Sequence, residues 1–237
     1  LINRPNKSML DRLVSQKTKL QVYFTLNFIV ALMAWFISWR ALLFFSFYIF
    51  LIWFYSHKLK KIVFIGNLSA ALLAVWPFFA ILLYYYQPTS IEELERHKDH
   101  FAVIIAHASF LFLLILIREL IKDLENLKGD LANNYHTIPV FYGESWSKRI
   151  STGLTVLTLV PVYILIELYD VGYMDIYFYS SLIVLLFFLL LLWQSNNKTH
   201  YIRLHNILKF LIVAGVFCIV LINPSVLWHG KNWLLKQ

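Results

Sequence analysis

The sequence predicts an all-α protein, a polytopic membrane helical bundle with seven transmembrane helices. Of its 237 residues, 60% are hydrophobic, 18% are aromatic and only 14% are charged. A soluble domain of this length lacks the interior to hide so much apolar surface, so the surrounding solvent must be lipid. The apolar residues also recur in stretches close to the ~20 residues that cross a hydrocarbon core.

The seven predicted spans cover residues 20–39, 41–55, 62–86, 101–117, 150–168, 176–193 and 207–228. The first two are almost continuous, but one helix made of both would be about 54 Å long, against a hydrocarbon core of about 30 Å. We therefore expect two helices with a hinge near Arg40. No low-complexity linker or internal repeat divides the chain, so residues 1–237 are interpreted as a single domain.

Positive charge is concentrated at one end of these spans. Most of the 21 Lys and Arg residues fall in segments 1–19, 58–61, 118–149 and 198–209, on one side of a seven-span topology. The positive-inside rule puts that side in the cytoplasm of a bacterial or archaeal cell, with the chain as a multi-pass integral membrane protein. Topology and anionic membrane lipids account for the net charge of +8, so we expect no nucleic-acid partner.

The first residues have the composition of a polar cytoplasmic loop. Leu1 is not an initiator methionine, and no charged segment with a cleavable apolar stretch follows it. We expect the chain to be truncated at its N-terminus.

Acidic side chains gather just after the fourth span. If the helix of 101–117 continues to about Gly129, four oxygen-bearing side chains fall within a sector of roughly 60° on one helix face. They belong to Glu119, Asp123, Asn126 and Asp130. Asp123 and Asp130 are about two turns, or roughly 10 Å, apart along the axis, so each would hold its own Mg²⁺, with phosphate oxygens bridging the two ions.

This segment has the residue types of a site for a metal-bound diphosphate. Hard divalent cations prefer carboxylate and phosphate oxygens, and no Cys lies nearby. Basic residues that would neutralise the remaining phosphate charge are Arg118, Lys122, Lys60 and Lys61. The alternative interpretation is a solvated helix end whose acids and bases form i,i+4 pairs.

The acidic segment resembles the second Asp-rich motif of the UbiA superfamily of membrane prenyltransferases, most closely its digeranylgeranylglyceryl phosphate synthase-like branch. The residues that carry the resemblance are Arg118-Glu119-x-x-Lys122-Asp123-x-x-Asn126-x-x-Gly129-Asp130, then Thr137-Ile138-Pro139 and Gly143. Two further segments are similar to the family. They are Tyr55-Ser56-His57-Lys58-Leu59-Lys60 with Gly66-Asn67, which matches its basic loop, and Ile2-Asn3-Arg4-Pro5-Asn6-Lys7, which matches the tail of its first Asp-rich motif.

The resemblance implies a nine-helix fold, of which this chain would contain the third to the ninth helix. It implies Mg²⁺-dependent transfer of a prenyl group from an isoprenoid diphosphate to a lipophilic acceptor, with geranylgeranylglyceryl phosphate as a candidate. On this basis we expect Asp123 and Asp130 to be catalytic, and metal ligands at Asp123, Asn126, Asp130 and Glu119. The expected substrate contacts are Tyr55, Lys60, Asn67, Arg118 and Lys122.

Two departures from the family pattern bear on the metal site. Asn126 stands where an Asp is usual and brings an oxygen without a charge, which predicts weaker Mg²⁺ binding unless Asp123 compensates. The acids of the first motif are absent from this sequence.

Other functions remain open on the sequence alone. An aromatic prenyltransferase of quinone or haem-type lipid synthesis would share the donor half-site. A transporter or noncatalytic scaffold would use the acids as a gate or docking surface, but most of the predicted spans lack the buried ionisable residues that proton-coupled carriers often contain.

Overall fold

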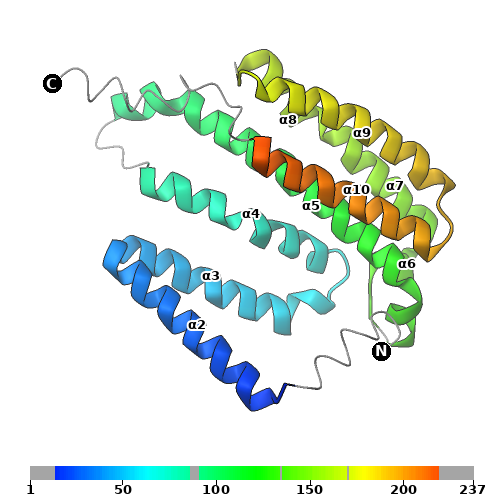
Figure 1. Ribbon diagram of the computed structural model, residues 1–237, viewed down its shortest axis with the longest axis horizontal. Coiled ribbons are helices and arrows are strands. Elements are labelled where there is room, and N and C mark those ends of the chain that lie inside the picture. The colour runs from blue at the N-terminus through cyan, green and yellow to red at the C-terminus, as the bar shows by residue number, and fades with distance from the viewer. Residues whose placement is uncertain (1–13, 86–90, 134, 170, 219–237) are drawn as a thin grey trace.

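The structure is a computed structural model that describes residues 14–85, 91–133, 135–169 and 171–218. Figure 1 shows an elongated bundle of helices, which confirms the all-α prediction for the described part. In chain order the elements are α2 (Gln16–Ile37), α3 (Trp39–His57), the 3₁₀ turn η1 (Leu59–Lys61), α4 (Ile65–Tyr85), α5 (Ile91–Ala132), α6 (Ile138–Tyr142), α7 (Glu144–Leu157), α8 (Leu159–Tyr163), the π-helical turn η2 (Ile164–Leu168), α9 (Met174–Gln194) and α10 (Lys198–Cys218).

The helices match the predicted membrane spans. Within the described residues, six segments are long and apolar enough to cross a membrane: Gln16–Ile37, Trp39–His57, Phe101–Ala132, Glu144–Leu168, Met174–Gln194 and Lys198–Cys218. The segment Glu144–Leu168 joins α7, α8 and η2. A shorter apolar helix, Ile65–Ala80 in α4, occupies the place of the remaining predicted span. The chain is therefore a multi-pass membrane protein.

The start of the last span was predicted wrongly. The prediction placed it at Ile207, but α10 begins at Lys198. The first turns of α10 are amphipathic, with Tyr201, Leu204 and Leu208 buried on one face, and average hydropathy does not detect a helix of this kind. Residues 219–228 of the predicted span lie outside the described residues.

The hinge between the first two spans lies at Ser38. Ala34 accepts a hydrogen bond from the Ser38 backbone N–H and so ends α2, while the Ser38 hydroxyl accepts from the Ala41 N–H at 3.1 Å and so begins α3. This N-cap explains why the chain turns just before Arg40, near the predicted position. Around the hinge, Trp35 and Phe36 are 66% and 79% exposed, as expected for side chains that face lipid.

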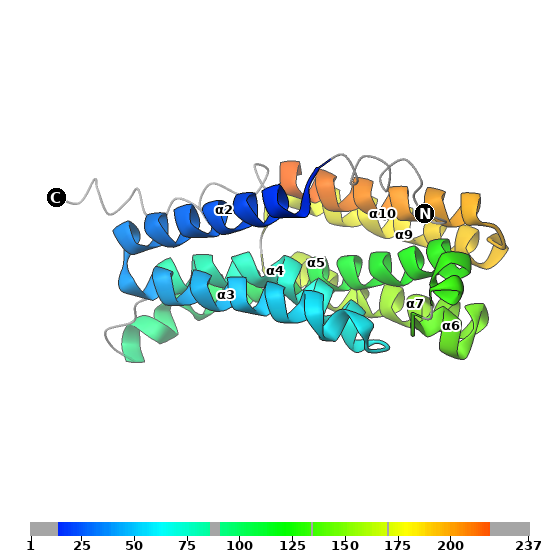
Figure 2. The ribbon, with the colours of Figure 1, turned by 90° about the horizontal axis from the view of Figure 1, so that it is seen from below.

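The longest helix, α5, is the centre of the bundle. It has 42 residues and is about 63 Å long at ~1.5 Å per residue, roughly twice the thickness of a hydrocarbon core. Its apolar stretch 101–117 crosses the membrane, and its C-terminal part extends to Ala132, which confirms the prediction of a helix that continues to about Gly129. Helix α4 packs along one side of α5 and α10 along another, as Figures 1 and 2 show.

Two clusters of buried side chains fix α5 against its neighbours. The larger joins α5 to α8, α9 and α10 and includes Phe110, Ile117 and Phe178. The smaller joins α4 to α5 through Ala71, Val75, Ala108, Ile115 and Leu116. Small residues such as Ala71 and Ala108 allow close backbone approach, which is what stabilises helix pairs in lipid. This packing sets which residue of α4 meets the acidic end of α5.

Candidate functional site

The predicted acidic face, meaning Glu119, Asp123, Asn126 and Asp130, lies on the polar end of α5. The turn between α3 and α4, the short helix α6 and the turn between α9 and α10 are found at the same end of the bundle (Figure 1). The face is partly covered rather than open to solvent: Glu119 is only 9% exposed, and the other three side chains are half-buried.

Helix α4 supplies a hydrogen-bond partner to this face. The side-chain amide of Asn67 donates to Oδ2 of Asp123 at 2.8 Å. The preceding Gly66 is buried, and a Cβ there would come within 3.1 Å of the Lys60 carbonyl oxygen and 3.3 Å of the Leu59 carbonyl oxygen. Glycine therefore lets the η1 turn lie close to the start of α4, where Asn67 meets Asp123.

The surroundings of Asp123 disfavour its ionised form. The pKa of the Asp123 carboxyl is raised from 3.8 to about 7, chiefly because the group is buried, and the hydrogen bond from Asn67 partly offsets the effect of burial. The negative charges of Asp130 and Glu119 contribute to the rise, and the positive charge of Lys122 opposes it. Each of these groups lies on the polar end of α5, beyond the apolar stretch. A divalent cation at this face would stabilise the ionised carboxylate.

Asn126 gives a second sign of a ligand site. Its buried side-chain oxygen accepts no hydrogen bond from any residue that the structure describes. A buried carbonyl oxygen without a donor is costly, and a metal ion or an ordered water would satisfy it. The donor set of two aspartates and this amide oxygen fits Mg²⁺, which binds oxygen ligands.

The aspartates do not converge on one point. In the described part of the chain, no group of three His, Cys, Asp or Glu side chains is close enough to hold a single metal ion. The expectation that Asp123 and Asp130, about two helical turns apart, each hold their own Mg²⁺ stays a prediction.

Glu119 already has cationic partners. Lys122 Nζ lies 2.5 Å from its Oε2, and Arg118 Nη1 lies 3.4 Å from its Oε1. Glu119 is therefore the least available of the four predicted metal ligands, and its role as a ligand stays a prediction. The same contacts keep Lys122 beside the acidic face, where it was expected to contact phosphate.

Arg118 turns toward α10 rather than toward Asp123. Its Nε donates to Nε2 of His205 at 3.3 Å, and His205 Nδ1 lies 2.9 Å from Oε2 of Glu125. Because Nε2 accepts, the ring proton is on Nδ1, which donates to Glu125. His205 is 3% exposed, whereas Arg118 and Glu125 are partly buried, so this Arg118–His205–Glu125 chain joins α5 to α10 through a buried imidazole.

The sequence reasoning missed His205 and Glu125. Glu125 follows Arg118 by seven residues and so shares its helix face, which was an available signal. Nothing in the sequence pairs that face with His205, because His205 on α10 is 80 residues further along the chain than Glu125.

The remaining predicted substrate contacts lie around the acidic face. Tyr55, in the last turn of α3, is half-buried and close enough to Glu119 and Asp123 for both charges to act on its phenol. Lys60 is exposed on η1, at the same end. The side chain of Lys61, and residues 1–13 with the segment similar to the first Asp-rich motif, lie outside the described residues.

Several curated digeranylgeranylglyceryl phosphate synthases are similar in sequence to this chain. The protein of Thermococcus sibiricus is 29% identical over 160 residues, which cover 67% of this chain and 52% of the relative. That of Pyrococcus furiosus is 27% identical over 177 residues, covering 74% of this chain and 59% of the relative. A shorter match to the Methanopyrus kandleri protein is 44% identical over 64 residues, or 24% of each chain.

The chain thus spans little more than half the length of the first two relatives. No solved structure matches it significantly. A model of the UbiA prenyltransferase family matches residues 2–207 and includes every residue of the acidic face. The chain belongs to the UbiA prenyltransferase family.

Proposed function

We propose that this protein transfers a prenyl group from an isoprenoid diphosphate to a lipophilic acceptor in a Mg²⁺-dependent reaction, with geranylgeranylglyceryl phosphate as the acceptor. Family membership and the printed name of the relatives support the reaction class and the acceptor. Residues 1–237 would act as one prenyltransferase-like domain, with the acidic face on the cytoplasmic side of an archaeal membrane.

The observation that carries the proposal is the acidic face itself. Asp123 is held by Asn67 across two helices, and the buried oxygen of Asn126 lacks a donor among the described residues. A solvated helix end would not bury its polar groups in this way, since exposed acids and bases find water or each other. Asp123, Asp130 and Asn126 therefore make up the proposed metal-binding half-site.

The chain's residues would act mainly through position and charge. Magnesium bound there would screen the negative charge that develops on the departing diphosphate. Asn67 keeps the Asp123 carboxylate oriented, and Lys122, held by Glu119, adds positive charge near the phosphates.

The transfer itself exchanges one C–O bond for another. The bond between the prenyl carbon and the diphosphate oxygen breaks, and its electron pair leaves with the diphosphate. The acceptor's hydroxyl oxygen attacks the cation-like prenyl carbon, forms an ether and releases its proton to solvent.

The test is an assay of the intact protein in membranes with geranylgeranyl diphosphate and geranylgeranylglyceryl phosphate. We expect product only with Mg²⁺, and a loss of about 100-fold or more in kcat/KM for Asp123→Asn and for Asp130→Asn. Glu167→Gln removes one charge from an exposed carboxylate in η2, at the opposite end of the bundle, and should leave turnover unchanged. Full activity in both aspartate variants, or after chelation of Mg²⁺, would contradict the proposal.

A further inference from the structure

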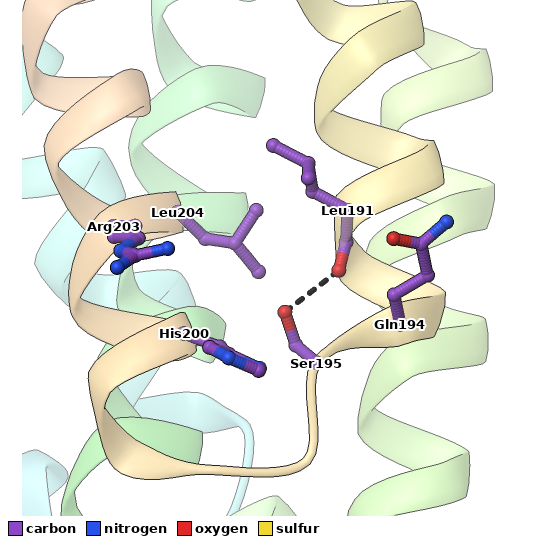
Figure 3. A pocket seen from close by; sticks show the side chains of 6 residues that line it. All are labelled: Leu191, Gln194, Ser195, His200, Arg203 and Leu204. Atoms are coloured by element: carbon purple, nitrogen blue, oxygen red, sulfur yellow. Dashed lines mark hydrogen bonds between the residues drawn. The ribbon is translucent and has the colours of Figure 1, made fainter.

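A cavity of about 250 Å³ lies between the end of α9 and the start of α10. Its lining comes from both helices and the turn between them: Leu191, Gln194, Ser195, His200, Arg203 and Leu204 (Figure 3). None of these residues belongs to the acidic face, and the proposed transfer reaction uses none of them.

The cavity combines hydrogen-bond donors with an apolar wall. Among the lining residues, Arg203, His200 and Gln194 carry N–H groups, and Leu191 and Leu204 are apolar. Arg203 forms no ion pair with any acid in the described part of the chain. An unpaired guanidinium favours a phosphate group, which it can bind with two parallel hydrogen bonds.

Hydrogen bonds from α7 and α10 fix the turn between α9 and α10 that borders the cavity. The backbone carbonyl of Ser195 accepts hydrogen bonds from Lys148 Nζ at 2.6 Å and from the Tyr201 hydroxyl at 3.1 Å. Lys148 is only 6% exposed, and the Ser195 hydroxyl donates to the Leu191 carbonyl at 2.7 Å, as Figure 3 shows. These bonds hold the turn in one conformation, so the cavity is formed before any ligand arrives.

The side of α10 that carries Arg203 is not the side that faces α5. Arg203 and His205 are two residues apart, about 200° around the helix, so Arg203 points away from the side on which His205 meets α5. On the outer surface beside the cavity, Leu191 and Trp193 are 43% and 51% exposed, as for lipid-facing residues near the end of a span.

We propose that this cavity binds the headgroup phosphate of an anionic membrane phospholipid, with Arg203 as the main anchor and Leu191 along the start of a hydrocarbon chain of the lipid. Charge complementarity and the apolar wall select a lipid phosphate over a free one. Binding here would tie α9 to α10 at the membrane surface, independently of the transfer reaction.

The experiment measures binding of dioleoyl phosphatidylglycerol to the purified chain in detergent by native mass spectrometry. Arg203→Gln is compared with the matched control Arg149→Gln, which removes the same charge at the same end of the bundle, from an exposed residue that stacks on Trp146. We expect Arg203→Gln to weaken binding about tenfold and Arg149→Gln to leave it unchanged. Dioleoyl phosphatidylcholine, whose headgroup carries no net charge, should bind equally weakly to all three proteins.

A second measurement guards against a folding defect. The thermal unfolding midpoint of the wild-type chain should rise in micelles doped with phosphatidylglycerol, and that of Arg203→Gln should not, although the two midpoints agree without the lipid. Equal phosphatidylglycerol binding by wild type and Arg203→Gln would overturn the proposal. Displacement of the lipid by millimolar inorganic phosphate would also overturn it, because the site would then recognise phosphate alone.

Discussion

The side-chain amide of Asn67 donates a 2.8 Å hydrogen bond to Oδ2 of Asp123, and this contact joins the first turn of α4 to the polar end of α5. The two residues are 56 positions apart in the chain. Their contact makes the orientation of the principal carboxylate of the acidic face depend on a neighbouring helix, and it leads to the first prediction.

Replacing Asn67 by Leu should reduce prenyl transfer about tenfold, because Asp123 loses its side-chain donor from α4 while Asp130 and Glu119 continue to repel it. The measurement is kcat/KM for the isoprenoid diphosphate at saturating Mg²⁺. Ser69→Ala is the control, since Ser69 lies two residues away and bonds to the backbone of its own helix region. A Leu variant as active as wild type would show that Asp123 needs no support from α4.

The Arg118–His205–Glu125 chain predicts a stability effect. His205→Ala should lower the free energy of unfolding by about 1–3 kcal/mol, because it removes a buried side chain and leaves the partly buried Glu125 without its donor. Thermal unfolding in detergent measures this change, with Asn206→Ala on the exposed side of α10 as the control. A double-mutant cycle with Glu125→Gln should give a coupling energy of at least ~0.5 kcal/mol, and additive effects would mean that the two side chains act separately.

The hydrogen bond from Lys148 on α7 to the turn between α9 and α10 predicts a similar loss of stability when Lys148 is replaced. Lys148→Met keeps most of the buried volume but removes the 2.6 Å hydrogen bond to the Ser195 carbonyl, so we expect a loss of about 1–2 kcal/mol. Arg149→Gln changes the adjacent exposed residue and should have little effect. Equal unfolding midpoints for Lys148→Met and wild type would show that the turn between α9 and α10 is held without Lys148.

Replacing glycine by alanine should change the stability of the protein in opposite directions at Gly143 and Gly153. Gly143 connects α6 to α7 with φ of +86°, a conformation that an L-residue adopts only under strain, so Gly143→Ala should destabilise the protein by about 1–3 kcal/mol. Gly153 lies inside α7 with no atom within 4 Å of an added Cβ, so Gly153→Ala should stabilise it by up to about 1 kcal/mol. Unfolding midpoints that shift in the same direction for both variants would contradict this assignment.

The membrane spans and the acidic face could be predicted from the sequence because both depend on local properties. An apolar stretch of about 20 residues predicts a membrane span, and residues spaced by three and four positions share one face of a helix, whatever the rest of the fold. The start of α10 was predicted wrongly because the prediction used only such local properties. Tyr201 and Leu204 become core residues only because α10 packs against its neighbours. The predicted roles of Asp123, Asp130 and Asn126 in metal binding remain predictions.

The sequence by itself determined the polytopic all-α fold, the hinge near Arg40 and the helical face that carries Asp123 and Asp130. Only the tertiary structure decided that Asn67 meets Asp123, that Arg118 turns to His205, and that a fixed turn closes a cavity beside Arg203. The physical reason is range. Hydropathy and helical periodicity act within a few residues, whereas these contacts join positions on different helices and arise from the way α4 and α10 pack against α5 and α9.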